Sequence, residues 1–175
     1  MASQQIITRF PPSPTGLFHV GSARTALFNY LYAKKYGGKL ILRIEDTDKE
    51  RSKKEYEENI IEGLTWLSIS YDEFYRQSER TEVYREHIDK LLSTGAAYES
   101  EESEGEHSSV IRFKNPGGVV SFHDEIRGAI SFDVSELGDF VIAKDRETPL
   151  YHLAVVVDDL VMGVTHIIRG EDGIS

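Results

Sequence analysis

Cysteine is absent from this chain of 175 residues. The chain can therefore form no disulfide and offers no thiolate to a metal, which excludes a disulfide framework and a cysteine-based zinc site. Long apolar runs are absent as well. The longest, Leu153 to Val157, is far too short to span a bilayer, and residues 1–8 lack the basic and apolar parts of a signal peptide. We expect a soluble, cytoplasmic protein with no membrane partner.

Basic residues are in the minority, with 20 Lys and Arg against 30 Asp and Glu and a formal net charge of −10. A general nucleic-acid binder normally presents a basic field, so the composition argues against that class. A partner RNA would need a local basic patch or basic residues from another segment. The remaining composition, 39% hydrophobic and 29% charged, is typical of a globular domain with one sizeable core.

Proline is scarce, yet three of the five prolines fall within residues 11–14. The β-branched run before them predicts a buried strand over 5–10. Apolar residues at helical spacing after them predict a helix over 23–34, ended by Gly37-Gly38. A second apolar run, 39–45, predicts another strand. Strand, loop, helix and strand in this order indicate a βαβ unit with a parallel sheet.

Further along, apolar spacing predicts two more helices, over 56–67 and 83–92, and the Glu-rich stretch 99–106 is expected to be a solvated linker. From Val110 onward the hydrophobic pattern has a period of two residues, which predicts a small β-rich insertion. Its strands are expected at 110–114, 118–123, 129–133 and 140–144. A helix over 151–160 and a strand over 164–169 then return the chain to α/β character.

The segment Arg9 to Ser22 reads RFPPSPTGLFHVGS and joins the first predicted strand to the first predicted helix. A βα loop of this composition is a phosphate-binding arrangement, because N–H groups of the first helical turn and the helix dipole attract anions. His19 can hydrogen-bond a phosphate oxygen as charge develops on it, and Gly21 lets a base or ribose approach the backbone. A structural turn with a capping histidine explains the same residues equally well.

Four segments carry a resemblance. RFPPSPTG at 9–16 with HVGS at 19–22 resembles the opening signature of class I aminoacyl-tRNA synthetases, specifically of the glutamyl branch. LRIEDTD at 42–48, YHLA followed by VDD within 151–159, and IRGED at 168–172 are similar to further segments of that family. One such segment is a weak signal, whereas four in order over nearly the whole chain are specific.

The resemblance implies an α/β fold of class I synthetase type. This fold is a Rossmann-like parallel sheet with helices on both faces, plus a small β-rich insertion. Residues 1–98 are expected to form the first half of the nucleotide-binding catalytic domain and 99–150 the insertion near the acceptor stem. Residues 151–175 would begin the second half of the catalytic domain.

The resemblance also implies an activity. A glutamate–tRNA ligase binds ATP and L-glutamate, forms glutamyl-adenylate, and transfers glutamate to the acceptor end of tRNA(Glu). Catalytic roles would fall to Thr15, His19 and Gly21, with Mg²⁺ accompanying ATP and no zinc. Contacts with ATP are expected from Thr15, Gly16, His19, Gly21, Ser22 and Asp172.

A glutamate site needs fixed cations for two carboxylates and a carboxylate for one ammonium. Arg9 and Arg169 can present bidentate forks. Glu45, at the carboxyl end of a strand, can hold the ammonium, and Ser13 and Tyr151 can add neutral hydrogen bonds. Taken singly, arginines and glutamates at strand ends are most often surface ion pairs that contribute little. The joint match of the four segments to the family favours a glutamate pocket over surface ion pairs.

Some positions depart from the family, and some of its parts are missing. Val155 stands where the family often carries a polar side chain, and Gly173 where it usually has His. The lysine-rich KMSKS loop and the helical anticodon domain of the family are not in this chain. We therefore expect weak binding and poor catalysis by this polypeptide alone. We also expect self-association through an unpaired sheet edge at 164–169.

Several alternatives stay open. Glutaminyl-tRNA synthetases usually have Glu-Pro-Asn where this chain has Ser13-Pro14-Thr15, and Asp-Asp where it has Glu45-Asp46. The short paralogue that glutamylates queuosine in tRNA also lacks an anticodon domain, but usually carries a cysteine-based zinc site. Outside enzymes, a non-catalytic nucleotide- or tRNA-binding module would keep the pocket without the chemistry, and a purely structural fragment would keep neither.

Overall fold

The computed structural model describes residues 5–101 and 109–174, with Asp172 described only in its backbone. Contacts divide the chain into two compact units, which are described separately below. The first unit comprises residues 1–81 and 155–175, and the second comprises residues 82–154. The domain limits expected at 98/99 and 150/151 were defined by role, so they stay a prediction.

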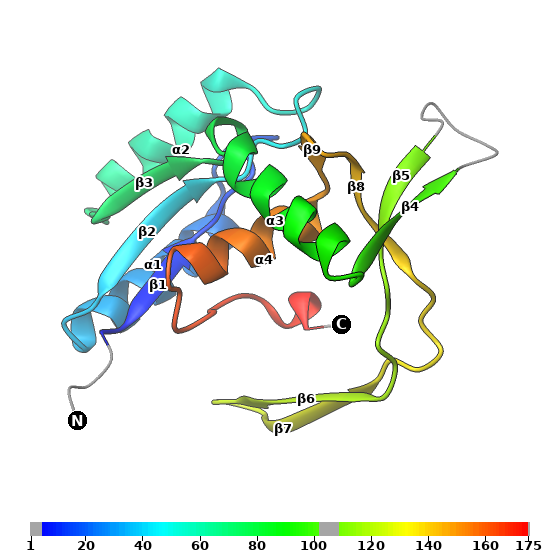
Figure 1. Cartoon of the computed structure of the whole chain (residues 1–175). Coiled ribbons are helices and arrows are strands. Elements are labelled where there is room, and N and C mark those ends of the chain that lie inside the picture. The colour runs from blue at the N-terminus through cyan, green and yellow to red at the C-terminus, as the bar shows by residue number, and fades with distance from the viewer. Residues whose placement is uncertain (1–4, 102–108, 175) are drawn as a thin grey trace. The chain divides into compact units, whose positions relative to one another are not determined.

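A three-stranded parallel sheet forms the centre of the first unit (Figure 1). Its strands are β1 (Ile7–Phe10), β2 (Lys39–Ile44) and β3 (Glu73–Arg76), in that order. The βαβ unit and the parallel sheet predicted from the sequence are confirmed. Strand β3 was not predicted, because its sequence EFYR is short and charged at both ends.

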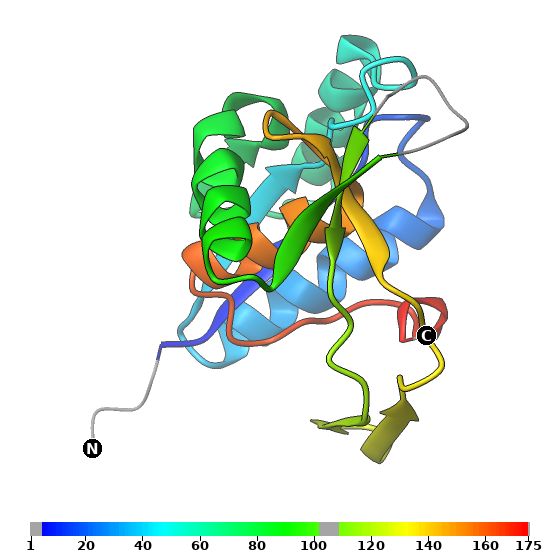
Figure 2. The same cartoon turned by 45° about the vertical axis from the view of Figure 1, so that its right-hand side comes forward.

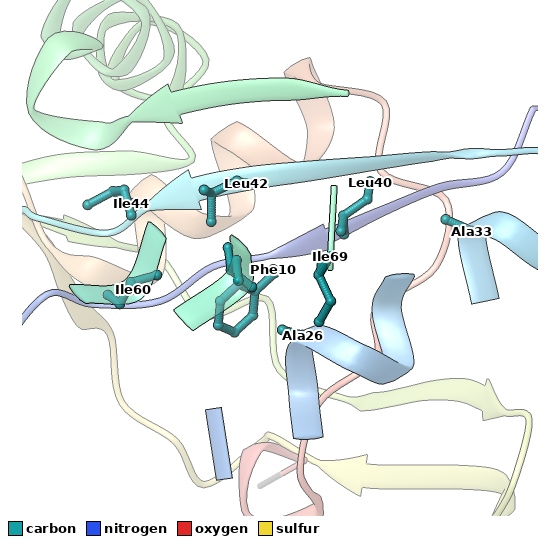
Figure 3. Packing of buried hydrophobic residues seen from close by; sticks show 9 residues of the cluster. Phe10, Ala26, Ala33, Leu40, Leu42, Ile44, Ile60 and Ile69 are labelled. Carbon is teal, nitrogen blue, oxygen red and sulfur yellow. The ribbon is translucent and has the colours of Figure 1, made fainter. Parts of the chain in front are cut away.

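Two helices cover one face of this sheet: α1 (Val20–Lys35) and α2 (Lys54–Trp66) (Figure 1). Both were predicted from apolar spacing. Because side chains alternate along a strand, the even-numbered residues of β2 all point to these helices. Figure 3 shows the resulting core, with side chains from strands and helices pointing toward one another. The core comprises Phe10, Ala26, Ala33, Leu40, Leu42, Ile44, Ile60, Leu64 and Ile69.

Helix α4 (Tyr151–Val161) was also predicted, and its residues from Val155 onward belong to the first unit. There Asp159 contacts Arg9 of β1 and Arg43 of β2, the odd-numbered side chains of the sheet. This part of α4 therefore lies against the face opposite to α1 and α2, and the predicted α/β fold is confirmed. No helix in the described ranges is long and apolar enough to cross a membrane.

The strand predicted over 164–169 is wrong. This segment has no regular secondary structure and leads into the 3₁₀ turn η2 (Glu171–Gly173). It does run beside β1, but the Thr165 hydroxyl accepts the Ile7 N–H at 2.8 Å, and the N–H groups of Thr165 and His166 both donate to Ile7 O. The Thr165 side chain thus takes the place of a backbone acceptor. No ladder of backbone hydrogen bonds therefore extends along residues 164–169.

The second unit contains α3 (Thr81–Ser93), whose first residue is assigned to the first unit, and two antiparallel sheets. One sheet has the order β4-β5-β8-β9, and the other is the β6–β7 hairpin (Figure 2). The predicted helix 83–92 and the predicted strands are confirmed, while β4 and β9 were not predicted. The strand bounds are β4 Ala97–Glu101, β5 Ser109–Phe113, β6 Val119–Asp124, β7 Gly128–Asp133, β8 Phe140–Asp145 and β9 Thr148–Pro149.

The solvated linker expected over 99–106 is corrected in its first part. Residues 99–101 belong to β4, where Glu99 is opposite Ile111 of β5. Burial alternates along the strand from the fully covered Ala97, so the glutamates occupy a regular pleated strand rather than a linker. Residues 102–108 lie outside the described part of the chain.

Candidate active site

The loop after β1 ends at His19, which is the N-cap of α1. Its backbone is extended, and Nδ1 accepts a hydrogen bond from the Gly21 N–H at 3.2 Å. Because Nδ1 acts as an acceptor, the neutral ring carries its proton on Nε2, which lies 3.2 Å from Ser22 Oγ. The start of α1 therefore combines the N–H groups of its first turn with an imidazole donor, an arrangement suited to an anion.

The same loop is fixed to α2. The Phe18 N–H donates to Asn59 Oδ1 at 2.9 Å, and Lys53 N donates to Pro14 O at 3.0 Å. The Phe18 ring packs so closely on Gly63 that a Cβ there would come within 2.3 Å of it. Sequence reasoning missed Asn59 and Gly63, although a glycine inside a helix is a recognised sign of close packing. The position of His19 thus depends on α2.

Several residues expected around ATP, together with Ser13 of the expected glutamate site, lie at the surface of this loop. Ser13, Thr15 and Gly16 are exposed, and the Thr15 N–H donates to Ser13 O at 2.9 Å in a tight turn. Ser22 is half-buried on the first turn of α1. The side chain of Asp172 lies outside the described part of the structure.

Two arginines on neighbouring strands share one carboxylate. Arg9 of β1 is 3% exposed, and its Nε donates to both Asp159 oxygens at 3.2 Å. Arg43 of β2 is fully buried and donates from Nη1 to Asp159 Oδ1 at 2.6 Å. Within the described part of the chain, Nε is the only side-chain nitrogen of Arg9 that donates a hydrogen bond. Its two terminal amino groups are therefore left for another acceptor.

Glu45 follows β2 and is buried, and its N–H donates to Pro12 O of the loop between β1 and α1. Its Oε1 accepts from Arg43 Nη2 at 2.9 Å and Nε at 3.3 Å. Burial raises the pKa of Glu45 to about 7, against the opposing pull of Arg43. No described group donates to Oε2, which leaves one acceptor for a cation. Arg9 and Glu45 are thus not surface ion pairs.

The ionic cluster extends away from these two residues. Asp158, adjacent to Asp159 on α4, accepts from Arg80 Nε at 2.7 Å and from Gln77 Nε2 at 3.0 Å. It also lies 3.7 Å from Arg43 Nε. We call Arg9, Arg43, Glu45, Arg80, Asp158 and Asp159 the ionic network; its three guanidinium groups balance three carboxylates.

Two further residues were predicted in the glutamate site, Arg169 and Tyr151. Arg169 is exposed and makes no ion pair with a described side chain. Its guanidinium lies over Gly173, where an added Cβ would come within 1.9 Å of Nε. Tyr151 begins α4 in the second unit and is partly exposed. The first unit thus connects Arg9 to Glu45 through Asp159 and Arg43, and it does not connect Arg169 to either.

Comparison with known proteins identifies the family. A model described as "tRNA synthetases class I (E and Q), catalytic domain" matches residues 5–107 and 99–175. The curated glutamate–tRNA ligase of Aquifex aeolicus is 46% identical over 97% of this chain and 44% of its own length. Glutamate–tRNA ligase 1 of Rubrobacter xylanophilus is 52% identical over 94% of this chain and 37% of its own length.

Solved structures give the same result. A glutamate tRNA ligase from Elizabethkingia meningosepticum, crystallised in complex with its amino acid, has a TM-score of 0.88 and 34% identity, covering 97% of this chain and 44% of that one. Glutamate-tRNA synthetase from Elizabethkingia anophelis has a TM-score of 0.87. This chain spans less than half the length of the relatives it matches. The resemblance found in the sequence is confirmed, and the chain belongs to the catalytic-domain family of the class I tRNA synthetases (E and Q).

Proposed function

We propose that this chain supplies the ATP and L-glutamate site of a glutamate–tRNA ligase. The observation that carries this proposal is the pairing of Arg9 with Glu45 in one buried ionic network. Arg9 keeps two terminal amino groups for an anion, and Glu45 keeps Oε2 for a cation. Arg9 thus offers a fixed pair of donors and Glu45 a fixed acceptor, both in a region of low dielectric. We assign the donors to the side-chain carboxylate of glutamate and the acceptor to its ammonium.

The second carboxylate of glutamate needs a second cation, which we assign to Arg169. In the structure its guanidinium lies over Gly173, and binding would require it to turn toward the substrate. Ser13 and Tyr151 would add neutral hydrogen bonds. Val155 offers no polar contact, so this chain would hold its substrate with one hydrogen bond fewer than family members with a polar residue there.

We assign ATP to the start of α1. His19 Nε2, the hydroxyls of Thr15 and Ser22, and the backbone at Gly16 and Gly21 would hold its phosphates and ribose, with Asp172 as a further contact. Residues 11–22 contain no carboxylate, which is the protein ligand that Mg²⁺ prefers. The ion would therefore be held by the ATP phosphates, and we derive no step from it.

In the proposed reaction, the α-carboxylate of glutamate attacks the α-phosphate of ATP, and pyrophosphate leaves. The terminal ribose hydroxyl of tRNA(Glu) then attacks the carbonyl carbon of the adenylate, an ester bond forms, and AMP leaves. The protein positions the reactants and stabilises charge, as in other phosphoryl transfers. Acceptor-end binding by residues 99–150, self-association and a cytoplasmic location stay predictions.

The test is binding followed by exchange. The chain is titrated with a non-hydrolysable sulfamoyl analogue of glutamyl-adenylate and with its glutaminyl counterpart, and pyrophosphate exchange is then measured with and without glutamate. We expect preferential binding of the glutamyl analogue and slow glutamate-dependent exchange, in line with the poor catalysis expected of this polypeptide alone. Binding without exchange would identify a non-catalytic module, and failure to bind either analogue would refute the proposed site.

A further inference from the structure

Asp159 lies between the guanidinium groups of Arg9 and Arg43. It accepts Arg9 Nε on both oxygens at 3.2 Å and Arg43 Nη1 on Oδ1 at 2.6 Å, and its side chain is 13% exposed. Arg43 in turn reaches Glu45 Oε1 with Nε and Nη2. Among the described residues, Asp159 and Arg43 therefore connect Arg9, the expected carboxylate-binding residue, to Glu45, the expected ammonium-binding residue.

Without this carboxylate the two arginines would repel each other. Burial lowers the pKa of Arg9 below its ordinary value, Asp159 opposes that change, and Arg43 adds to it. Like charges in a buried site interact strongly because the effective dielectric is low. Asp159 thus neutralises a pair of cations that adjacent parallel strands hold side by side.

We propose that Asp159 is the positioning residue of the glutamate site, an inference that rests on the proposed function. By taking Nε of Arg9, it directs the two terminal amino groups of Arg9 to the side-chain carboxylate of glutamate, which the adenylate analogue retains. By taking Nη1 of Arg43, it fixes the rest of that guanidinium on Oε1 of Glu45, which leaves Oε2 for the substrate ammonium. Asp159 itself touches neither ATP nor glutamate.

The chain offers a matched control in Glu57 of α2. Its side chain is 14% exposed, close to that of Asp159, and it accepts Arg76 Nε and Nη2 at 2.8–3.2 Å. Glu57 is therefore an equally buried carboxylate that holds a guanidinium, but it contacts no residue of the ionic network. Removing the negative charge of Asp159 or of Glu57 should destabilise the fold. Only the removal at Asp159 should weaken substrate binding.

The experiment compares Asp159→Asn with Glu57→Gln in the full chain. Calorimetry measures binding of the sulfamoyl analogue of glutamyl-adenylate and of ATP alone, and thermal unfolding measures stability. An asparagine presents N–H groups to an arginine that also donates, so one guanidinium loses its partner. We expect Asp159→Asn to weaken analogue binding by at least about tenfold with ATP binding unchanged. Glu57→Gln should leave both affinities unchanged.

The outcomes separate this inference from the proposed function. If the wild-type chain does not bind the analogue, the proposed function itself fails. If the wild type binds and Asp159→Asn weakens ATP as much as the analogue, or weakens neither, the positioning role is refuted. Should Asp159→Asn not fold, Asp159→Glu decides, since it keeps the charge on a longer side chain. It should weaken the analogue by about threefold or more with ATP unchanged, and wild-type affinity would overturn the inference.

Discussion

The two faces of the parallel sheet are both buried, yet they differ in chemistry. Leu40, Leu42 and Ile44 of β2 point to α1 and α2, whereas Arg43 points to α4 with Arg9 beside it. Apolar burial contributes directly to stability. A buried ion pair recovers little beyond its own desolvation and is weak evidence for stability. One strand thus carries the apolar core on one side and the proposed glutamate site on the other.

The largest effect is expected from Arg43→Met. This change leaves Glu45 and Asp159 buried without their shared partner, which typically costs about 3–5 kcal/mol of unfolding free energy. It should also abolish binding of the glutamyl-adenylate analogue in the fraction that remains folded. Urea unfolding and calorimetry test both points. Wild-type affinity in a folded Arg43→Met chain would contradict a binding role for the ionic face.

Leu42, next to Arg43 in β2, tests the apolar face in the same way. Leu42 is fully buried on the opposite face, and Leu42→Ala should cost about 3 kcal/mol through lost burial and the cavity left behind. The analogue affinity of the folded fraction should be unchanged, because no charge of the ionic network moves. A loss of affinity as large as that of Arg43→Met would mean that the two faces are not separable.

The apolar face was largely predictable from the sequence, because its signal is local. Alternation and helical spacing placed β1, β2, α1 and α2 without knowledge of distant contacts. The failures have identifiable causes: β3 has no apolar run, and at 164–169 the Thr165 hydroxyl takes a bond that a ladder would need. Hydrophobic periodicity therefore gave no signal for β3, and it gave no warning of the side-chain hydrogen bond made by Thr165.

The ionic face was predictable only in part. Arg9 and Glu45 were identified through motifs, but the network that holds them was not. The partners of Arg9 and Arg43 on α4 lie 150 and 116 residues away in the sequence. An arginine inside a strand predicts nothing about burial until its carboxylate is known. Sequence reasoning therefore found candidate ligands of the substrate and missed the residues that position them.

A smaller effect is expected where α2, on the apolar face of the sheet, packs against the loop between β1 and α1. In Gly63→Ala, the added Cβ would come within 2.3 Å of the Phe18 ring, so the loop must shift. Overpacking costs about 1–3 kcal/mol and helix propensity returns about 1 kcal/mol, which predicts a net loss of about 0–2 kcal/mol of unfolding free energy. ATP binding should weaken with it, because Phe18 precedes His19. Exposed Glu62→Ala is the control, and equal ATP affinities in the two variants would refute the coupling.

The smallest effect is a titration that only the ionic face can show. The pKa of Glu45 is raised from about 4.5 in the unfolded chain to about 7 in the native state, chiefly by burial. The native state therefore keeps a proton that the unfolded state has lost. The stability that Glu45 contributes is complete below pH 4.5 and is lost as the pH rises through about 7. Substrate binding needs the opposite form, since only the ionised carboxylate attracts an ammonium.

Binding of the glutamyl-adenylate analogue should therefore weaken by about tenfold between pH 8 and pH 6, where about nine in ten Glu45 side chains are protonated. ATP alone makes no use of Glu45, so its affinity should change much less over this range. Glu45→Gln should bind the analogue weakly at both pH values and remove the difference between them. A wild-type chain whose analogue affinity is constant from pH 6 to pH 8 would show that Glu45 does not hold the ammonium, because a carboxylate that titrates near neutrality cannot bind a cation equally well on both sides of its pKa.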